Sequence, residues 1–334
     1  MGEQQPPVPH TRRPRTWGVW SELKLEILKR YLTRFTTAAK RSPACVYIDA
    51  FAGTGTGVSR TTEEPFDGSP RIALQTQPPF THLFFCEMHT PAAYLQRALA
   101  NDFPDDRRYR VTAGDCNGTI PQVLQHLRAQ NLGWAPTFAF VDPDGMEVDF
   151  NTLRSLAEHK RGYRKGSSRP EFKVELWLLF PSPAIERVVS KERRDNITVA
   201  ESRATRLFGS TEWAVIHDLR TTRALEASQA RTSYVELMRW RLETVLGYRW
   251  AHALEMQDLV GRPVYHMILA TDHPAGTEIM SHLYGWAVRA ALPRYDQAKQ
   301  QLTGQPRLFD MPPITSKQPA GYRYEQPLPP LHGN

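Results

Sequence analysis

A short apolar run at residues 45–48 ends at Asp49 and leads through small residues into a glycine-rich turn, Gly53-Thr54-Gly55. Such a run predicts a strand that is buried on both faces. Further strands are expected at residues 82–86 before Glu87, at residues 109–113 before Gly114-Asp115, and at residues 137–141 before Asp142-Pro143. Helical segments are expected between them, at residues 91–100 and 121–130. This alternation predicts an α/β fold with a doubly wound, mostly parallel, Rossmann-like sheet whose ligand lies beyond the carboxyl ends of the strands.

The rest of the chain is expected to extend this core. Apolar residues at the helical period predict an amphipathic helix over residues 17–40, and Gly68-Ser69-Pro70 predicts a helix capped by Ser69. Apolar runs at residues 174–180 and 264–270 predict two more strands, the second followed by a helix over residues 278–291. We divide the chain into a disordered basic arm (1–16), an α/β core (17–184), a helical insertion or cap (185–256), the final strand and helix of the core (257–302) and a Pro-rich tail (303–334).

The composition favours a nucleic-acid partner without requiring one. The 334 residues include 42 lysines and arginines against 35 aspartates and glutamates, a net charge of +7, and excess positive charge attracts polyanions. No run of about 18 apolar residues occurs, so no membrane span and no membrane partner are expected. Residues 1–15 are rich in proline and arginine and lack the apolar stretch of a secretory signal, so we expect a cytoplasmic protein.

The three cysteines, Cys45, Cys86 and Cys116, are widely spaced and form no C-x-x-C pair. Each lies beside a predicted strand, which is typical of small buried side chains in a reducing compartment. No second ligand lies at a spacing that zinc requires, so no metal site is expected.

The glycine-rich turn indicates which ligand the sheet holds. A nicotinamide-binding fold carries G-x-G-x-x-G after its first strand, whereas this chain has Asp49, then Phe51, and then Gly53, Gly55 and Gly57 in a D-x-F-x-G-x-G-x-G order. A carboxylate at the strand end would repel a pyrophosphate but suits a cationic group such as the α-amino group of S-adenosylmethionine. Because glycine lacks a side chain, the backbone can approach such a ligand closely.

The acids at the next two strand ends fit the same cofactor. Glu87 can accept hydrogen bonds from both ribose hydroxyls, and Asp115 can accept one from the adenine amino group with Cys116 beside it. Each acid alone has the alternative interpretation of a solvated loop residue. The three in order predict an S-adenosyl-L-methionine site formed by Asp49, Phe51, Gly53, Gly55, Glu87, Asp115 and Cys116.

Asp142-Pro143-Asp144-Gly145 occupies the place where amino-methyltransferases carry D-P-P-[YF]. In that motif an acid and a proline carbonyl hold the target amino group and an aromatic ring stacks on the base, so positioning supplies most of the catalysis. Asp142 and Pro143 are therefore the candidate catalytic residues. Asp144 and Gly145 replace the second proline and the ring, and a simple turn remains an alternative. Rings that could replace the missing one are those of Phe150, Trp177 and Phe180.

Two further features carry less specific signals. His273 follows the strand at residues 264–270, where it could act on a substrate or cap a helix. Basic residues gather in the segment with Lys160, Arg161, Arg164, Lys165 and Arg169, and again at Arg187, Lys191, Arg193 and Arg194. The first group could hold phosphates or be solvated, and the second is interpreted as a solvated helix face.

Together, these motifs resemble one family over most of the chain. They are YIDAFAGTG (47–55), DGSP (67–70), FCE (85–87), GDCN (114–117), FVDPDG (140–145), LLFPS (178–182) and ATDHPAGTEIM (270–280). The sequence is similar to the three-Cys-motif partner protein (TcmP) family. The resemblance implies a class I S-adenosylmethionine-dependent methyltransferase-like fold and a protein partner that itself bears the three-cysteine motif. A more distant resemblance connects the chain with RlmJ-type ribosomal RNA adenine methyltransferases, which act on an exocyclic amine.

Three functions remain open at this point. The first is a methyltransferase acting on an exocyclic amine of RNA or DNA, with Asp142 and Pro143 orienting the acceptor. The second is a non-catalytic or cofactor-binding scaffold for a three-cysteine-motif protein, which the missing ring after Pro143 favours. The third is methylation of a protein or small molecule, because charge alone does not select nucleic acid.

Overall fold

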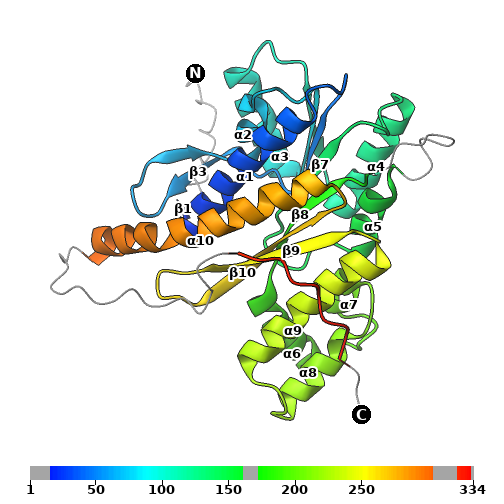
Figure 1. Ribbon diagram of the computed structural model, residues 1–334, viewed down its shortest axis with the longest axis vertical. Helices are drawn as coiled ribbons and strands as arrows, with labels where there is room; N and C mark the ends of the chain where they lie inside the picture. The colour runs from blue at the N-terminus through cyan, green and yellow to red at the C-terminus, as the bar shows by residue number, and fades with distance from the viewer. Residues whose placement is uncertain (1–15, 161–171, 304–321, 332–334) are drawn as a thin grey trace, which may run out of the picture.

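The computed structural model describes residues 16–160, 172–303 and 322–331, and it is built around a seven-stranded sheet. The strand order is β6-β5-β2-β7-β8-β10-β9 (Figure 1). The strands are β2 (Val46–Asp49), β5 (His82–Glu87), β6 (Tyr109–Ala113), β7 (Thr137–Val141), β8 (Glu175–Phe180), β9 (Trp250–Gln257) and β10 (Pro263–Thr271). All neighbours are parallel except that β10 runs antiparallel to both β8 and β9. The expected doubly wound, mostly parallel α/β fold is confirmed.

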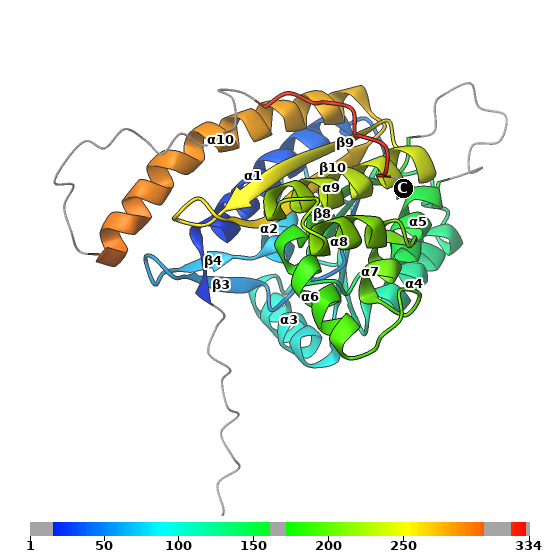
Figure 2. The ribbon, with the colours of Figure 1, turned by 90° about the horizontal axis from the view of Figure 1, so that it is seen from below.

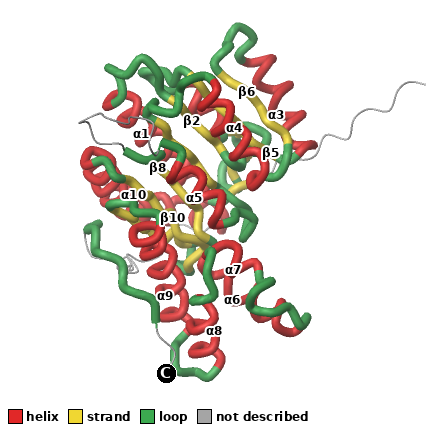
Figure 3. Tube along the Cα trace, turned by 90° about the vertical axis from the view of Figure 1, so that its right-hand side faces the viewer, coloured by secondary structure: helices red, strands yellow, loops and turns green. Residues whose placement is uncertain are grey.

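Helices cover both faces of this sheet. One face carries α1 (Val19–Ala38), α2 (Ser69–Gln75), α3 (His89–Asp102) and α10 (Pro274–Thr303). The other face carries α4 (Cys116–Ala129), α5 (Phe150–Glu158), α6 (Ser182–Arg194), α7 (Arg203–Phe208), α8 (Trp213–Thr221), α9 (Ala227–Trp240) and a π-helical turn, η1 (Arg241–Val245). Figure 1 shows α1 and α10 crossing the first face side by side, and Figure 3 shows α4 and α5 in front of the strands on the second.

Alternation along each strand divides the apolar side chains between two cores. On β2, Val46 and Ile48 point to the face of α4 and α5, whereas Tyr47 points to the face of α1. All three are fully buried, as expected of a central parallel strand with helices on both sides. This two-sided burial explains why the strand reads as a continuous apolar run.

A second, smaller sheet lies beside the start of α1. It contains β1 (Thr16–Trp17), β3 (Thr56–Ser59) and β4 (Pro65–Asp67), and Figure 2 shows β3 and β4 projecting as a ribbon. The segment between the glycine-rich turn and α2 forms an antiparallel pair of strands. Its strands, TGVS and PFD, hold too few apolar residues to give an apolar run.

The helical segment after β8 is shorter than its sequence suggests. Helical structure expected through residue 256 ends at η1, and residues 250–257 form the edge strand β9. On this strand Leu254 and Met256 are buried while Glu255 and Gln257 are partly exposed. A half-buried edge strand alternates with period two and lacks the apolar run that marks the central strands.

The ends of the chain lie largely outside the described residues. The proposed basic arm is described only at Thr16, and the Pro-rich tail only at residue 303 and over residues 322–331. Residues 322–331 lie in an extended conformation along α9 (Figure 1). There the Arg239 guanidinium donates to the Glu325 carbonyl, and the Leu328 backbone amide donates to Glu236. Among the described helices, none has a stretch long and apolar enough to cross a membrane.

The glycine-rich turn after β2 is fixed by contact with the start of α2. Gly53 and Gly55 have φ values of 63° and 82°, a region that side chains disfavour. The Gly68 amide donates to the Gly55 carbonyl at 2.9 Å. A Cβ added at Gly68 would lie 3.0 Å from the carbonyl carbon and oxygen of Gly55. Gly68 therefore lets the two segments touch.

We expect Gly68→Ala to lower the free energy of unfolding by about 1–3 kcal/mol, because backbone atoms must move to admit the methyl group. Gly118→Ala is a matched control. Gly118 lies in α4 with nothing within 4 Å of an added Cβ, so alanine should stabilise by about 0.5–1 kcal/mol there. Urea unfolding of both variants measures the difference, and an equal effect of the two substitutions would contradict this account.

Candidate functional site

Four acidic residues lie at the carboxyl ends of four adjacent parallel strands. Asp49 is the last residue of β2, Glu87 the last of β5, and Asp115 and Asp142 follow β6 and β7. In the sheet register Asp49 pairs with Phe85 on one side and with Phe140 on the other, so the strands end at one edge. The structure therefore brings these predicted residues together at the edge where an open α/β sheet binds its ligand.

Asp49 lies at the centre of this edge and is fully buried. Its carboxylate accepts hydrogen bonds from the Tyr47 hydroxyl at 3.1 Å and from the Phe51 backbone amide at 3.2 Å. Burial raises the pKa of Asp49 to about 7, and hydrogen bonding offsets only part of that effect. Within the described ranges no cation forms an ion pair with Asp49, so its carboxylate can pair with a cation from a ligand.

Glu87 connects the second strand to the glycine-rich turn. Its Oε2 accepts from the Gly53 amide at 2.6 Å and its Oε1 from the Met88 amide at 2.7 Å. Each carboxylate oxygen can accept a second hydrogen bond. Glu87 is only partly buried, so its carboxylate is not closed off by the core.

Asp115 and Cys116 lie at the start of α4. The Asp115 side chain caps the helix by accepting from the Asn117 amide at 2.7 Å, and Cys116 is buried beneath it. Burial raises the pKa values of Cys45, Cys86 and Cys116 to about 12, so all three are inert thiols, each free of a disulfide. Cys116 can contact a ligand through its backbone or its neutral side chain, but it does not supply a thiolate.

Asn117 is a site residue that the sequence did not single out. Its amide nitrogen donates to the Glu147 carbonyl at 2.8 Å, and its oxygen accepts from the Asp149 amide at 2.9 Å and the Thr152 hydroxyl at 2.7 Å. Asn117 therefore ties the loop after β7 to the start of α4. A recess of about 510 Å³ lies there, lined by Asp115, Asn117, Gly118, Met146, Glu147, Asp149, Arg203 and Arg206.

The fourth acid, Asp142, forms an ion pair with Lys24 of α1. The ammonium lies 2.5 Å from Asp142 Oδ2, and Lys24 is only 1% exposed. It lies 5.9 Å from the ring centre of Phe140 and 5.5 Å from that of Tyr265. The other carboxylate oxygen, Oδ1, is buried and accepts no hydrogen bond from the described residues. The sequence did not point to Lys24, because it lies 118 positions before Asp142 in a helix that was expected only to pack against the core.

The structure supplies no stacking ring from the three expected positions. Phe150, Trp177 and Phe180 are each fully buried. Phe150 packs against the Arg241 guanidinium, the Trp177 indole donates to Tyr284 at 2.9 Å, and Phe180 packs edge-on against Phe208. None of the three rings is exposed where it could face a base, because each already fills the core. Pro143 is buried, whereas Asp144 is exposed in the same loop.

The other singled-out residues serve local structure where they are described. His273 directly precedes α10, and its Nδ1 accepts from the Ala275 amide at 3.1 Å, which is the capping alternative. Arg161, Arg164, Lys165 and Arg169 lie outside the described residues, and Lys160 is buried. Arg187, Lys191, Arg193 and Arg194 are exposed on α6, as expected for a solvated face. The described side chains include no cluster of three or more potential metal ligands.

Comparison with known proteins finds similarity among solved structures. No family model matches the chain, and no curated protein matches it. A crystal structure of a Legionella pneumophila protein, described as a member of family DUF519, aligns with a TM-score of 0.44 and 13% sequence identity. The alignment covers 84% of this chain and 94% of that one.

The burial of Asp49 predicts a pH-dependent stability. Its pKa in the folded chain, about 7, exceeds the ordinary value of 3.8, so the folded state binds a proton that the unfolded state releases between these values. Protonated Asp49 therefore stabilises the folded state at low pH, and the free energy of unfolding falls as pH rises from about 4 to about 7. We expect Asp49→Asn to be more stable than wild type at about pH 8, with the gain shrinking towards about pH 5.

Urea unfolding at both pH values measures this gain. Asp105→Asn, which removes an exposed carboxylate, controls for the change in net charge. A gain for Asp49→Asn that is the same at both pH values would contradict the assignment of a buried, protonatable carboxyl.

Proposed function

We propose that this chain binds S-adenosyl-L-methionine and transfers its methyl group to an exocyclic amine of nucleic acid. The observation that carries the proposal is the row of four acids, Asp49, Glu87, Asp115 and Asp142, at the carboxyl edge of adjacent strands. The cofactor would supply an activated methyl group. The chain would supply binding, orientation and charge.

The strand order supports this choice of cofactor. Numbered along the chain within the large sheet, the order is 3-2-1-4-5-7-6, with the seventh strand antiparallel. A dinucleotide-binding sheet has the order 3-2-1-4-5-6. The antiparallel strand inserted before the last position therefore distinguishes this sheet from a dinucleotide-binding one.

The cofactor half of the site would divide its work among the first three strand ends. Asp49 lacks a counter-ion among the described residues, and an α-amino group would supply one. Glu87 retains a free lone pair on each oxygen for the ribose hydroxyls, and Asp115 lies one strand further out for the adenine amino group. The positive φ values of Gly53 and Gly55 hold a turn whose backbone a ligand can approach.

The acceptor half would rest on Asp142, Pro143 and Lys24. Asp142 Oδ1 is buried without a hydrogen-bond donor among the described residues, which is costly unless a ligand supplies one. An amino group of a base is such a donor. Lys24 holds the other oxygen, fixes the carboxylate and balances its charge. The Pro143 carbonyl would accept the second proton of the same amino group, so that the nitrogen lone pair is aimed at the methyl group.

Cofactor binding should depend on the protonation of Asp49. A carboxyl with a pKa of about 7 in the free protein must lose its proton to receive an amino group. We expect the affinity for S-adenosylhomocysteine to fall about tenfold from about pH 8 to about pH 6. Asp49→Asn should bind more weakly, with no such dependence. Calorimetry measures both, and a wild-type protein that does not bind at any pH would sink the cofactor assignment.

Methyl transfer should depend on the Lys24–Asp142 pair. We expect Asp142→Asn and Lys24→Met each to lower transfer of labelled methyl groups to RNA or DNA by about 10²–10³-fold, because the acceptor is no longer held. Binding of S-adenosylhomocysteine should change by less than about threefold, which also reports that the variants fold. Lys29→Met, at an exposed position of the same helix, should be as active as wild type. Unchanged transfer in both site variants would contradict the role of the pair.

One observation favours a second function. The loop after β7 offers Asp144 and Gly145 where a ring would stack on a base, and the three alternative rings lie in the core. A chain that binds the cofactor without turnover, as a scaffold for a three-cysteine-motif protein, would fit this arrangement. Methyl transfer by the isolated chain to any RNA, DNA, protein or small molecule would exclude the scaffold function.

A further inference from the structure

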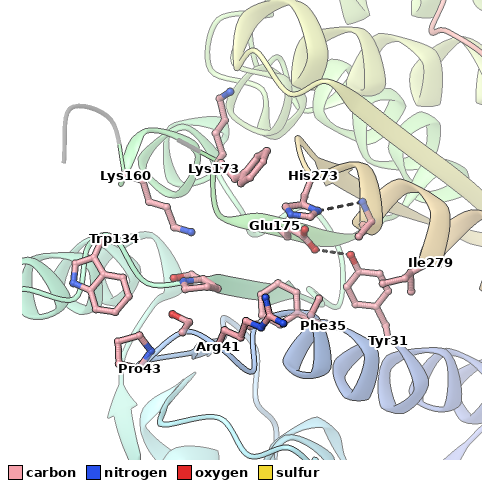
Figure 4. Close-up of a pocket in the computed structure, with 18 residues that line it drawn as sticks. Tyr31, Phe35, Arg41, Pro43, Trp134, Lys160, Lys173, Glu175, His273 and Ile279 are labelled. Carbon is pink, nitrogen blue, oxygen red and sulfur yellow. Dashed lines mark hydrogen bonds between the residues drawn. The ribbon is translucent and has the colours of Figure 1, made fainter. Parts of the chain in front are cut away.

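A second pocket lies at the opposite edge of the sheet from the four acids. It has a volume of about 390 Å³ and opens between the amino ends of β7 and β8, the carboxyl end of α1 and the start of α10 (Figure 4). This volume is within the range of small-molecule sites. The lining includes Phe35, Trp134 and Ile279 as apolar walls and Glu175, Lys160 and Arg41 as charged groups.

Glu175 is a buried charged group of this lining and is 7% exposed. Its Oε2 accepts from the Tyr31 hydroxyl at 2.5 Å, and its Oε1 accepts from the Thr271 hydroxyl at 3.0 Å. Both partners are neutral, and within the described ranges no cation forms an ion pair with it. Burial raises the pKa of Glu175, although the two hydroxyls and the nearby Lys160 lower it in part. A cation brought by a ligand would relieve this burial cost.

The fold is adapted to keep this carboxyl in place. Gly276, in the first turn of α10, lies against it, and an added Cβ there would be 2.9 Å from Glu175 Oε1, 2.7 Å from the Thr271 hydroxyl and 3.2 Å from the Tyr31 hydroxyl. Three elements, α1, β10 and α10, therefore converge on one carboxyl group. A carboxyl held this closely beside an open pocket is a preorganised acceptor.

The opposite side of the pocket carries positive charge. Figure 4 shows the Lys160 ammonium directed into the pocket, with the Arg41 side chain at the same opening. Lys160 is 8% exposed, so its charge is held in a partly dry environment where it attracts anions strongly. Lys173 also lines the pocket, where its ammonium pairs with Asp272 at 3.0 Å and donates to the Gly247 carbonyl at 2.7 Å.

We propose that this pocket binds a small zwitterion of the amino-acid class, independently of the cofactor site. The ligand's amino group would lie against Glu175, its carboxylate against Lys160 and Arg41, and its apolar side group among Phe35, Trp134 and Ile279. A lining that holds one buried acid and the bases Lys160 and Arg41 favours a ligand that carries both charges. The apolar walls select a side group such as that of phenylalanine, leucine or methionine.

Calorimetry with L-phenylalanine and its two truncated forms tests this assignment on the full chain. Phenethylamine keeps only the amino group, and 3-phenylpropionate keeps only the carboxylate. We expect L-phenylalanine to bind with a Kd of about 0.1–1 mM and each fragment to bind at least about tenfold more weakly. Wild-type protein that binds 3-phenylpropionate as well as L-phenylalanine, or binds none of L-phenylalanine, L-leucine and L-methionine at about 5 mM, overturns the proposal.

Two substitutions test which charged residue holds which end of the ligand. Glu175→Gln should weaken the binding of L-phenylalanine about tenfold and leave the binding of 3-phenylpropionate unchanged. Lys160→Met should weaken the binding of both of these compounds but not that of phenethylamine. Glu243→Gln is the matched control, because Glu243 is also a carboxyl that accepts from a tyrosine, at 2.7 Å from Tyr324, but lies outside the pocket. It should bind like wild type.

Binding of S-adenosylhomocysteine by the same variants separates this pocket from the other edge and reports folding. Equal binding of L-phenylalanine by wild type and Glu175→Gln would contradict the role of the buried acid. If Glu175→Gln does not fold, the comparison of the three probes on wild-type protein still decides the question. A chain that binds L-phenylalanine but not S-adenosylhomocysteine would support this pocket and refute the proposed function.

Discussion

The buried carboxyl of Asp49 is the constraint on which the candidate site depends. It lies at the end of the central strand, where both neighbouring strands and both helical layers exclude water. A charge in that position is unfavourable without a counter-charge. The ligand-free protein limits the cost through hydrogen bonds and a raised pKa, and a cationic ligand would remove it. The glycine-rich turn, Glu87 and Asp115 are arranged around this point, so the geometry of the edge favours one orientation of a bound cofactor.

The central part of the fold was predictable from the sequence because its strands are buried on both faces. The apolar run of β7 matches its observed bounds at residues 137–141, and every residue of that strand is buried. The edge strand β6 also lies at the expected residues 109–113, although it is only partly buried. Strands β3, β4 and β9 gave no continuous apolar run. On β9, Glu255 and Gln257 alternate with buried residues. The short strands β3 (TGVS) and β4 (PFD) contain few apolar residues, so neither gives an apolar run.

The candidate site was predictable only where its residues follow strands. Asp49, Glu87, Asp115 and Asp142 could be placed together because parallel strands end at one edge. Lys24 could not, because its role arises from the way α1 crosses the sheet and directs one ammonium to Asp142. Asn117 was similarly hidden, since its side chain bridges to a loop about 30 residues away. The rings of Phe150, Trp177 and Phe180 looked available only because sequence does not show which aromatic residues fill the core.

The most direct test of the account is a crystal structure of the chain with S-adenosylhomocysteine. The account predicts that the ligand lies across the carboxyl ends of β2, β5 and β6, with its amino group on Asp49, its ribose on Glu87 and its adenine beside Asp115. It also predicts that Asp142 and Lys24 face the sulfur atom. A ligand bound elsewhere, or bound with its amino group turned away from Asp49, would contradict the central claim.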